Sequence, residues 1–322
     1  MSTLGLPQGE LWRQVSPRSS VHQGLRKVVC ALWESGTAAG RNFPGDGPCL
    51  RRGLGPEATL LRHAEGRDGV RPVPTDRKRA PLPQPWGPDT YLVEHRWQGW
   101  SDEAESPLDG VQSAQDLHTL LATAGEHGPY VLVGHSTGGT HAMTYAARYP
   151  EQVAGMVLLD SSSPEQFTRM PAYPGVYAML RRLYGVLPTL SRLGLGQLVP
   201  GTSHLPAADA ATVNAMTSVP QAYRNQRDEV SILPEVFTQA RALTTLGDRP
   251  LAVLTASATI AGTEGWDGAQ DRLAGLSTNS EHRTVDSTHP GLLEDSGPAA
   301  ESVRAINEVI DSVRTGGPLG PP

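Results

Sequence analysis

The sequence predicts an α/β fold in which a mostly parallel sheet carries helices on both faces. Three observations support this prediction. Apolar, β-branched runs at 130–133, 153–159 and 251–254 are typical of buried parallel strands. Helical patterns separate these runs, which favours crossover connections over hairpins. Residues 161–246 hold short helical patterns interrupted by prolines, which indicates a helical insertion above the sheet.

The regular pattern begins near Thr90 and predicts alternating strands and helices. Short apolar runs predict strands, whereas apolar residues at steps of three and four predict helices. Prolines, among them Pro174, Pro188 and Pro220, are expected to break the helices of the insertion, and Asp295 or Ser296 to cap the last helix. In order, the expected elements are a strand at 91–93, a helix at 108–124, a strand at 130–133, a helix at 142–149, a strand at 153–159, helices at 176–187 and 233–246, strands at 251–254 and 283–285, and a helix at 298–313.

The first 88 residues differ from the rest of the chain in charge and composition. They hold 13 of the 27 basic and 7 of the 33 acidic side chains, so they are net basic while the remainder is net acidic. They also hold both cysteines, 11 of the 28 prolines and 12 of the 35 glycines. Two alternatives stay open: a divergent segment that still forms the first strands, or a sequence that forms no core, for example through a shifted reading frame. The abrupt change near Thr90 favours the second.

These features predict a domain organisation and exclude several classes of protein. No run of about 18 apolar residues exists, so no membrane span is expected, and the absence of a signal pattern leads us to expect a cytoplasmic location. The acidic body argues against nucleic acid as a partner, and two cysteines are too few for a zinc cluster. The expected parts are an atypical Pro/Gly/Arg-rich segment, either divergent or disordered, at 1–88, a core at 89–162 and 248–314, a helical cap at 163–247 and a disordered tail at 315–322.

A G-x-S-x-G motif occupies Gly134-His135-Ser136-Thr137-Gly138. The pattern alone is weak in a chain with 35 glycines, but it directly follows the apolar run at 130–133 and precedes a helical pattern. This is the strand–turn–helix setting of a nucleophile elbow, whose tight turn exposes the serine hydroxyl at the carboxyl edge of the sheet. Small flanking residues fit because larger ones would collide with the strand and the helix. We therefore predict Ser136 as a catalytic nucleophile, with Gly134, His135 and Gly138 forming the elbow.

A serine nucleophile needs a base to take its proton, and His289 is the predicted base. It lies between the last expected strand and the last expected helix, in a loop at the sheet edge where Ser136 is also expected. His282 is a second choice, because it lies inside or just before a strand. His135 and His141 are close to Ser136 in sequence and are expected to pack or to face solvent.

The third member of a triad is a carboxylate that orients the imidazole. Asp160 directly follows the strand at 153–159 and should emerge at the same edge of the sheet. The usual alternative follows the next core strand, where residues 255–259 contain no acid, and Glu264 and Asp267 come only later. We therefore favour Asp160, which also gives the chain order Ser, acid, His expected of such a fold.

The chain resembles a known family. The stretches GPYVLVGHSTGG (128–139), AARYPEQVAGMVLLDSSSPEQ (146–166) and RPLAVLTA (249–256), with the loop of His289, are similar to the α/β-hydrolase superfamily, specifically its actinobacterial esterase-like and proline-iminopeptidase-like branch with a helical cap. In some capped members the acid follows the strand after the elbow helix, which agrees with Asp160. Residues 99–102 resemble the end of the family's D-R-x-G-x-G-x-S loop, although residues 94–98 depart from it.

An oxyanion hole needs two backbone N–H donors, and the sequence offers one clear candidate. Thr137, the residue after the nucleophile, should supply the first. The zone expected to supply the second, at 72–88, contains no suitable strand and glycine-rich turn. The nearest substitute is the apolar run at 28–33 followed by a turn, which makes Gly36 or Thr37 a weak candidate.

These residues together predict a serine hydrolase that cleaves a carboxylic ester through an acyl-enzyme. The alternatives are a catalytically impaired protein of this fold that lacks a complete oxyanion hole, and a peptidase of the same fold. The expected partner is a small-molecule ester or amide, and no metal or cofactor is implied. Leucines of the cap suggest a hydrophobic substrate group, or equally serve only to seal the cap onto the core: Leu180, Leu183, Leu187 and Leu190.

Overall fold

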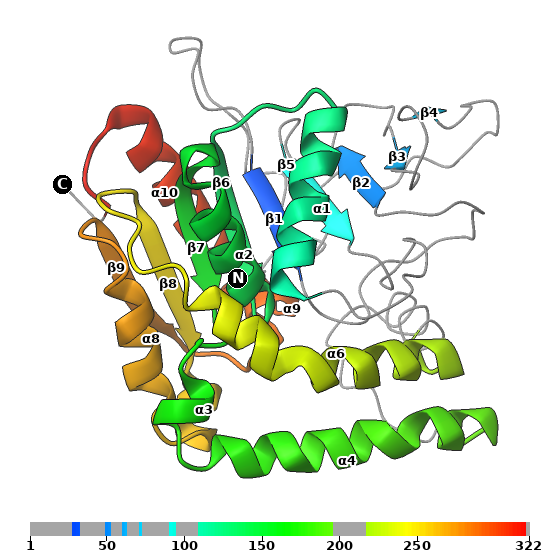
Figure 1. Ribbon diagram of the computed structural model, residues 1–322. Helices are drawn as coiled ribbons and strands as arrows, with labels where there is room; N and C mark the ends of the chain where they lie inside the picture. The colour runs from blue at the N-terminus through cyan, green and yellow to red at the C-terminus, as the bar shows by residue number, and fades with distance from the viewer. Residues whose placement is uncertain are drawn as a thin grey trace, which may run out of the picture.

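The strands that the structure describes form a nine-stranded sheet with the order β4-β3-β2-β5-β1-β6-β7-β8-β9 (Figure 1). The computed structural model describes residues 109–195 and 217–319 throughout, and the backbone of five strands within residues 28–94. From β5 to β9 all neighbouring strands are parallel, whereas β2, β3 and β4 pair antiparallel. The strands are β1 (Val28–Leu32), β2 (Cys49–Arg52), β3 (Leu60–Arg62), β4 (Arg71–Pro72), β5 (Thr90–Glu94), β6 (Tyr130–His135), β7 (Val153–Leu159), β8 (Leu251–Ala256) and β9 (Ser280–Val285).

The first 88 residues contribute strands to this sheet. The run expected to be a strand at 28–33 forms β1, which lies between β5 and β6 and pairs with both of them in parallel. Val28, for instance, is in register with Thr90 on one side and with Val131 on the other. This is the arrangement expected of a divergent segment that still forms strands. The choice between this and the other alternative, a sequence that forms no core, stays a prediction.

Helices cover both faces of the sheet, as the alternation of strands and helices predicted. Figure 1 shows α1 and α2 on one side and α10 on the other. The helix expected at 142–149 begins earlier, at Gly138, directly after the G-x-S-x-G turn. The helices of the core are α1 (Gly110–Thr123), α2 (Gly138–Arg148), the 3₁₀ turn η2 (Pro150–Gln152), α7 (Ser257–Gly262), α8 (Trp266–Ala274), α9 (Gly291–Glu294) and α10 (Ser296–Thr315).

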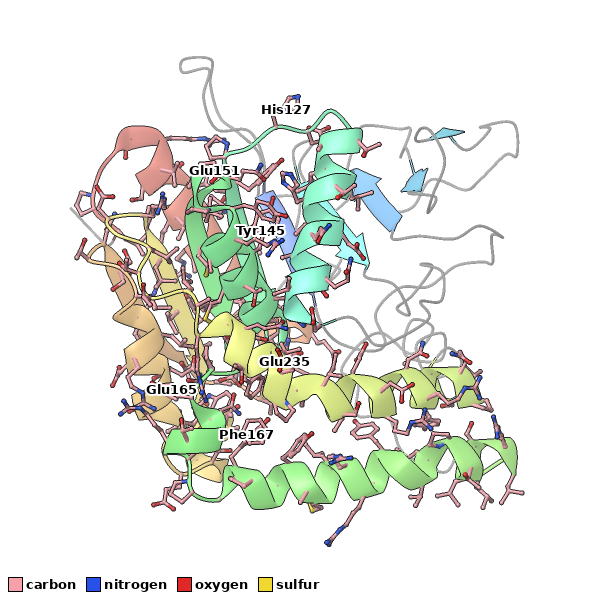
Figure 2. The ribbon with its side chains drawn as sticks, in the orientation of Figure 1. His127, Tyr145, Glu151, Glu165, Phe167 and Glu235 are labelled. Atoms are coloured by element: carbon pink, nitrogen blue, oxygen red, sulfur yellow. The ribbon has the colours of Figure 1, made fainter. Side chains whose placement is uncertain are left out.

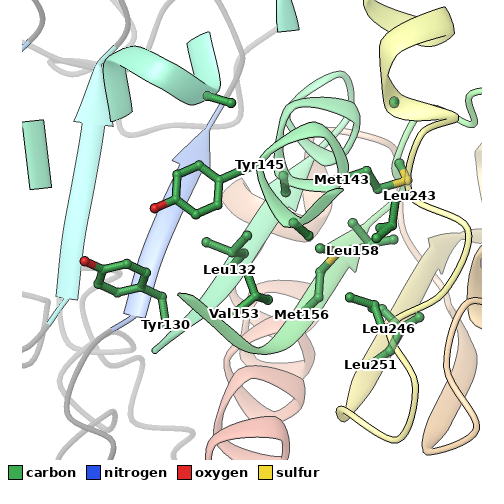
Figure 3. Packing of buried hydrophobic residues seen from close by; sticks show 14 of the residues in the cluster. Tyr130, Leu132, Met143, Tyr145, Val153, Met156, Leu158, Leu243, Leu246 and Leu251 are labelled. Carbon is green, nitrogen blue, oxygen red and sulfur yellow. The ribbon is translucent and has the colours of Figure 1, made fainter. Parts of the chain in front are cut away.

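The core strands bury alternate side chains on opposite faces of the sheet. On β7, Met156 and Leu158 enter the cluster beneath α1 and α2, whereas Val157 and Leu159 enter the cluster beneath α10. Figure 3 shows the first cluster, in which Leu132 of β6 lies among side chains from β7, α2 and β8. Because both faces are covered, β7 is apolar throughout and β6 and β8 are nearly so, which explains why these three strands read as continuous apolar runs rather than as alternating patterns.

The described residues between β7 and β8 include three helices of the insertion, which lies at the carboxyl end of the sheet: α3 (Gln166–Arg169), α4 (Tyr173–Arg192) and α6 (Pro220–Ala240). The expectation that prolines break these helices is wrong at Pro188, which lies inside α4, and α6 likewise runs through Pro234. Pro174 and Pro220 stand in the first turn of their helices, where no N–H donor is needed. Pro188 is tolerated because its stretch of α4 is held by packing, with Leu187 and Ser191 also buried.

Aromatic rings join the three inserted helices to one another. The ring of Phe167 on α3 lies 5.0 Å from that of Tyr173 and 4.9 Å from that of Tyr177 on α4, centroid to centroid. The same ring lies 5.6 Å from Phe237 on α6, and Figure 2 shows Phe167 where the three helices meet. Of the leucines singled out on α4, Leu187 is buried at 4% exposure and Leu183 is exposed at 47%. Sealing therefore accounts for Leu187 and not for Leu183.

The described helices lie within residues 109–195 and 217–319. No helix in that part of the chain combines the length and the apolar character needed to cross a bilayer.

Candidate active site

The G-x-S-x-G turn has the backbone strain expected of a nucleophile elbow. Ser136 directly follows β6 and precedes α2, and it has φ of 54°, a left-handed value that non-glycine residues rarely adopt. Its N–H donates to Leu159 O at 3.2 Å, and its carbonyl accepts from Ser162 N at 2.9 Å. These bonds tie the strained residue to the end of β7 and to the segment just beyond it.

The glycines around Ser136 allow the strand, the turn and the helix to approach one another. A Cβ added at Gly134 would lie 2.6 Å from Gly139 Cα and 2.7 Å from Gly138 O, which are backbone atoms that cannot give way. A Cβ at Gly139 would lie 1.8 Å from Ser161 Oγ. Small residues are therefore required at these positions by contact, as the sequence predicted for Gly134.

The structure brings His289 and Asp160 into direct contact although 129 positions separate them. His289 Nδ1 donates to Asp160 Oδ2 at 2.6 Å. Asp160 follows β7 directly, and His289 lies in the loop between β9 and α9. The His289 side chain is 31% exposed, whereas Asp160 is fully buried. One partner is therefore open to solvent or substrate, and the other acts from within the protein.

Four donors surround the carboxylate of Asp160. Oδ1 accepts from Trp266 Nε1 at 2.8 Å and from Ala256 N at 3.3 Å. Oδ2 accepts from Thr259 Oγ1 at 2.5 Å in addition to His289 Nδ1. Asp160 also has a left-handed backbone, with φ of 42°, and its N–H donates to Leu254 O at 2.6 Å.

These surroundings keep Asp160 ionised despite its burial. Burial is the largest single effect and raises the pKa of Asp160, because water no longer solvates the charge. Hydrogen bonds from His289, Thr259 and Trp266, with the charge of His289, act in the opposite direction and outweigh it. The pKa of Asp160 therefore lies below its usual value.

His135, the residue before Ser136, contacts the histidine loop. Its Nε2 donates to the backbone carbonyl of His289 at 3.0 Å, and the two imidazole rings lie 4.4 Å apart. His135 is completely buried, so this contact ties the loop of His289 to the end of β6. The sequence placed His135 in the elbow but gave no sign of this contact.

The alternative candidates lie in other surroundings. Glu264 and Asp267 are exposed on the surface around the start of α8. His282, the second choice for the base, has both ring nitrogens engaged: Nδ1 with Asp271 Oδ1 at 2.7 Å and Nε2 with Thr255 Oγ1 at 2.7 Å. His141 is buried within α2, in keeping with a packing role.

The oxyanion candidates are only partly described. Thr137 precedes the first residue of α2, so its N–H belongs to the start of a helix, where N–H groups have no intrahelical acceptor. Gly36 and Thr37 lie outside the described residues, so the second donor stays a prediction.

The sequence predicted no role for two residues of this site. Thr259 lies on α7 and Trp266 begins α8, and both reach Asp160 across the sheet edge because β8 lies next to β7. Neither belongs to a motif, and both are more than 95 positions from Asp160 in sequence. Only the neighbouring place of β7 and β8 in the sheet brings them together.

Comparison with known proteins agrees with this fold. The family model described as "alpha/beta hydrolase fold" matches residues 77–239. The solved structure of DBJA superposes with a TM-score of 0.54 over 73% of this chain and 85% of that chain, at 15% identity, which is a likeness of fold alone. The chain therefore belongs to the α/β hydrolase fold family.

Its relatives include proteins named as lipases. Lipase LipV of Mycobacterium tuberculosis is 57% identical over 69 residues, which cover 21% of this chain and 24% of that protein. Monoacylglycerol lipase of Mycolicibacterium smegmatis is 32% identical over 138 residues, which cover 42% of this chain and 44% of that protein. The matched segments span between 10% and 44% of the length of the curated relatives. The family and these relatives support a hydrolase.

Proposed function

We propose that this chain is a serine hydrolase that cleaves carboxylic esters through a covalent acyl-enzyme. In this proposal Ser136 is the nucleophile, His289 the general base and Asp160 the carboxylate that orients the base. The observation that carries it is the 2.6 Å contact of His289 Nδ1 with the buried Asp160. The left-handed backbone of Ser136 between β6 and α2 supports it independently.

The contact with Asp160 determines which nitrogen of His289 acts as the base. Because the carboxylate accepts a hydrogen bond from Nδ1, the neutral ring keeps its proton there and leaves Nε2 free of a proton. Nε2 takes the hydroxyl proton of Ser136 while the serine oxygen bonds to the ester carbonyl carbon. The backbone N–H of Thr137 stabilises the negative oxygen that forms. Asp160 remains ionised and stabilises the imidazolium.

The two halves of the reaction use the same base. Collapse of the first tetrahedral intermediate breaks the bond to the alcohol oxygen, which takes the proton from His289 Nε2. In the second half His289 takes a proton from water, whose oxygen bonds to the acyl carbon. The acid is then released, and the proton returns to the oxygen of Ser136.

The insertion and the relatives support a proposal for the substrate class. We propose that residues 163–247 act as a cap that selects the substrate, with an apolar acyl or alcohol group as its preferred ligand. Exposed apolar side chains on α4, among them Met179 at 60% and Leu183 at 47% exposure, support an apolar group. The relatives named as lipases point to the same class of ester.

Hydrolysis of p-nitrophenyl butyrate by the wild-type chain and by Ser136→Ala tests this proposal. We expect a loss of kcat of about 10⁶ in the variant, as for removal of a triad nucleophile. Ser231→Ala is the matched control, because Ser231 is an exposed serine of α6 whose hydroxyl donates to Asp228 O, and it should keep wild-type activity.

Two outcomes would favour the alternatives. Cleavage of proline amides in preference to the ester would identify a peptidase of this fold. A folded wild-type protein without ester or amide hydrolysis would identify an impaired member that lacks a complete oxyanion hole.

A further inference from the structure

The usual alternative position for the acid of the triad is the segment after β8. In this protein that segment instead supplies hydrogen-bond donors to Asp160. Residues 255–259, which end β8 and begin α7, contain no carboxylate. Instead, Thr259 Oγ1 donates to Asp160 Oδ2 at 2.5 Å, and Trp266 Nε1 donates to Asp160 Oδ1 at 2.8 Å. β7 and β8 are adjacent and parallel, so the two segments that follow them emerge at the same edge.

Each donor holds a different oxygen of the carboxylate. Trp266 fixes Oδ1 from one side, with Ala256 N as a second donor at 3.3 Å. Thr259 shares Oδ2 with His289. A carboxylate bound at both oxygens cannot rotate about its Cβ–Cγ bond without breaking hydrogen bonds, so Oδ2 stays aimed at His289 Nδ1.

The tryptophan is itself fixed by packing. Its indole is buried and lies in a small cluster with Met170 and Ala269. Met170 directly follows α3, the first helix of the insertion, whereas Ala269 is on α8. The donor to Oδ1 is therefore held between the insertion and the core.

We propose that Thr259 and Trp266 are positioning residues, which lock Asp160 in the orientation that presents Oδ2 to His289. This inference rests on the proposed function, because it assigns the two residues to the reaction through Asp160 and His289. The lowered pKa of Asp160 agrees with it, since both donors favour the charged form.

The test uses isosteric or near-isosteric variants that remove one donor each. In Thr259→Val and Trp266→Phe we expect kcat for the p-nitrophenyl ester to fall about 10- to 100-fold, the range for a lost hydrogen bond to a buried charge. KM should stay within about twofold, because neither side chain is proposed to touch the substrate. Thr259→Ser keeps the hydroxyl and should retain activity close to wild type. Thr238→Val is the matched control, because its hydroxyl donates to Pro234 O on the exposed face of α6.

A double-mutant cycle with Asp160→Asn separates positioning from general structural damage. If the two residues act through the carboxylate, Thr259→Val and Trp266→Phe should change kcat by less than about twofold in the Asp160→Asn background. The same 10- to 100-fold loss in that background, or wild-type kcat of both single variants, would overturn the proposal. Should Trp266→Phe fail to fold, Thr259→Val and Thr259→Ser carry the test.

The two proposals fail in distinguishable ways. Wild-type activity that survives Ser136→Ala would remove the proposed function and the positioning roles with it. Activity that depends on Ser136 but is unaffected by Thr259→Val and Trp266→Phe would remove only the positioning roles.

Discussion

Replacing Asp160 by asparagine should abolish most activity while leaving the protein folded. Asp160 accepts four hydrogen bonds, two at each oxygen, whereas asparagine offers one accepting oxygen and one donating NH₂ group. If the NH₂ group took the place of Oδ1, it would face the N–H groups of Trp266 and Ala256, and neither of these can accept. We therefore expect the NH₂ group to take the place of Oδ2.

At that position both partners can adapt. The hydroxyl of Thr259 can turn to accept, and His289 Nδ1 can accept once the proton has moved to Nε2. The ring then presents an N–H to the serine instead of a lone pair and cannot serve as its base. The corresponding loss in a well-studied serine protease is about 10⁴ in kcat, which is about 5.4 kcal/mol of transition-state stabilisation.

The stability of Asp160→Asn should change much less than its activity. Hydrogen bonds to the charged oxygen become neutral ones, at a cost of about 1–3 kcal/mol in the free energy of unfolding. Steady-state hydrolysis of p-nitrophenyl butyrate and urea unfolding at pH 7 measure the two quantities. A variant that keeps more than a tenth of wild-type kcat, or one that does not fold, would refute this reasoning.

Three further predictions concern pH, packing and the inserted helices. Because the pKa of Asp160 is lowered in the folded protein, its stabilisation is complete above the unfolded value of about 3.9 and is lost as pH falls through the folded value. In urea unfolding, the stability difference between wild type and Asp160→Asn should stay constant from about pH 6 to about pH 4 and shrink below that. Gly139→Ala places a Cβ 1.8 Å from Ser161 Oγ and should lower the free energy of unfolding by about 1–3 kcal/mol. Adding Ser161→Gly should restore part of this loss, which a thermal melt of the double variant would measure. Leu187→Ala on α4 should lower the free energy of unfolding by about 2–5 kcal/mol because Leu187 is buried. Leu183→Ala should change it by less than about 0.5 kcal/mol. Equal losses in the two variants would contradict the packing of α4 against α6.

The core of the fold could be predicted because its signals are local. β7 coincides with the expected run at 153–159, and β6 and β8 contain the expected runs at their beginnings. Strands buried on both faces must be apolar at every position, so each one is visible in a short window of sequence. The site at the sheet edge follows from where these strands end.

The inserted helices were harder to predict because their continuity depends on contacts between them. Pro188 and Pro234 would each interrupt an isolated helix, yet α4 and α6 run through them. The aromatic contacts of Phe167 with Tyr177 and Phe237 that join these helices involve residues 10 and 70 positions from it, which no local pattern reveals.

The candidate site was likewise only partly predictable from the sequence. The order and setting of Ser136, Asp160 and His289 follow from strand ends, and the structure brings Asp160 and His289 together. The donors Thr259 and Trp266 have no motif, and the link from His135 to the His289 carbonyl depends on the fold of a distant loop. Such contacts become visible only when the strand order is known.

Covalent labelling by a fluorophosphonate probe, followed by mass spectrometry of the digested protein, tests the central claim most directly. The account predicts one adduct on the peptide that contains Ser136, and its loss in Ser136→Ala but not in Ser231→Ala. Folded wild-type protein that remains unlabelled, or an adduct that persists in Ser136→Ala, would contradict it.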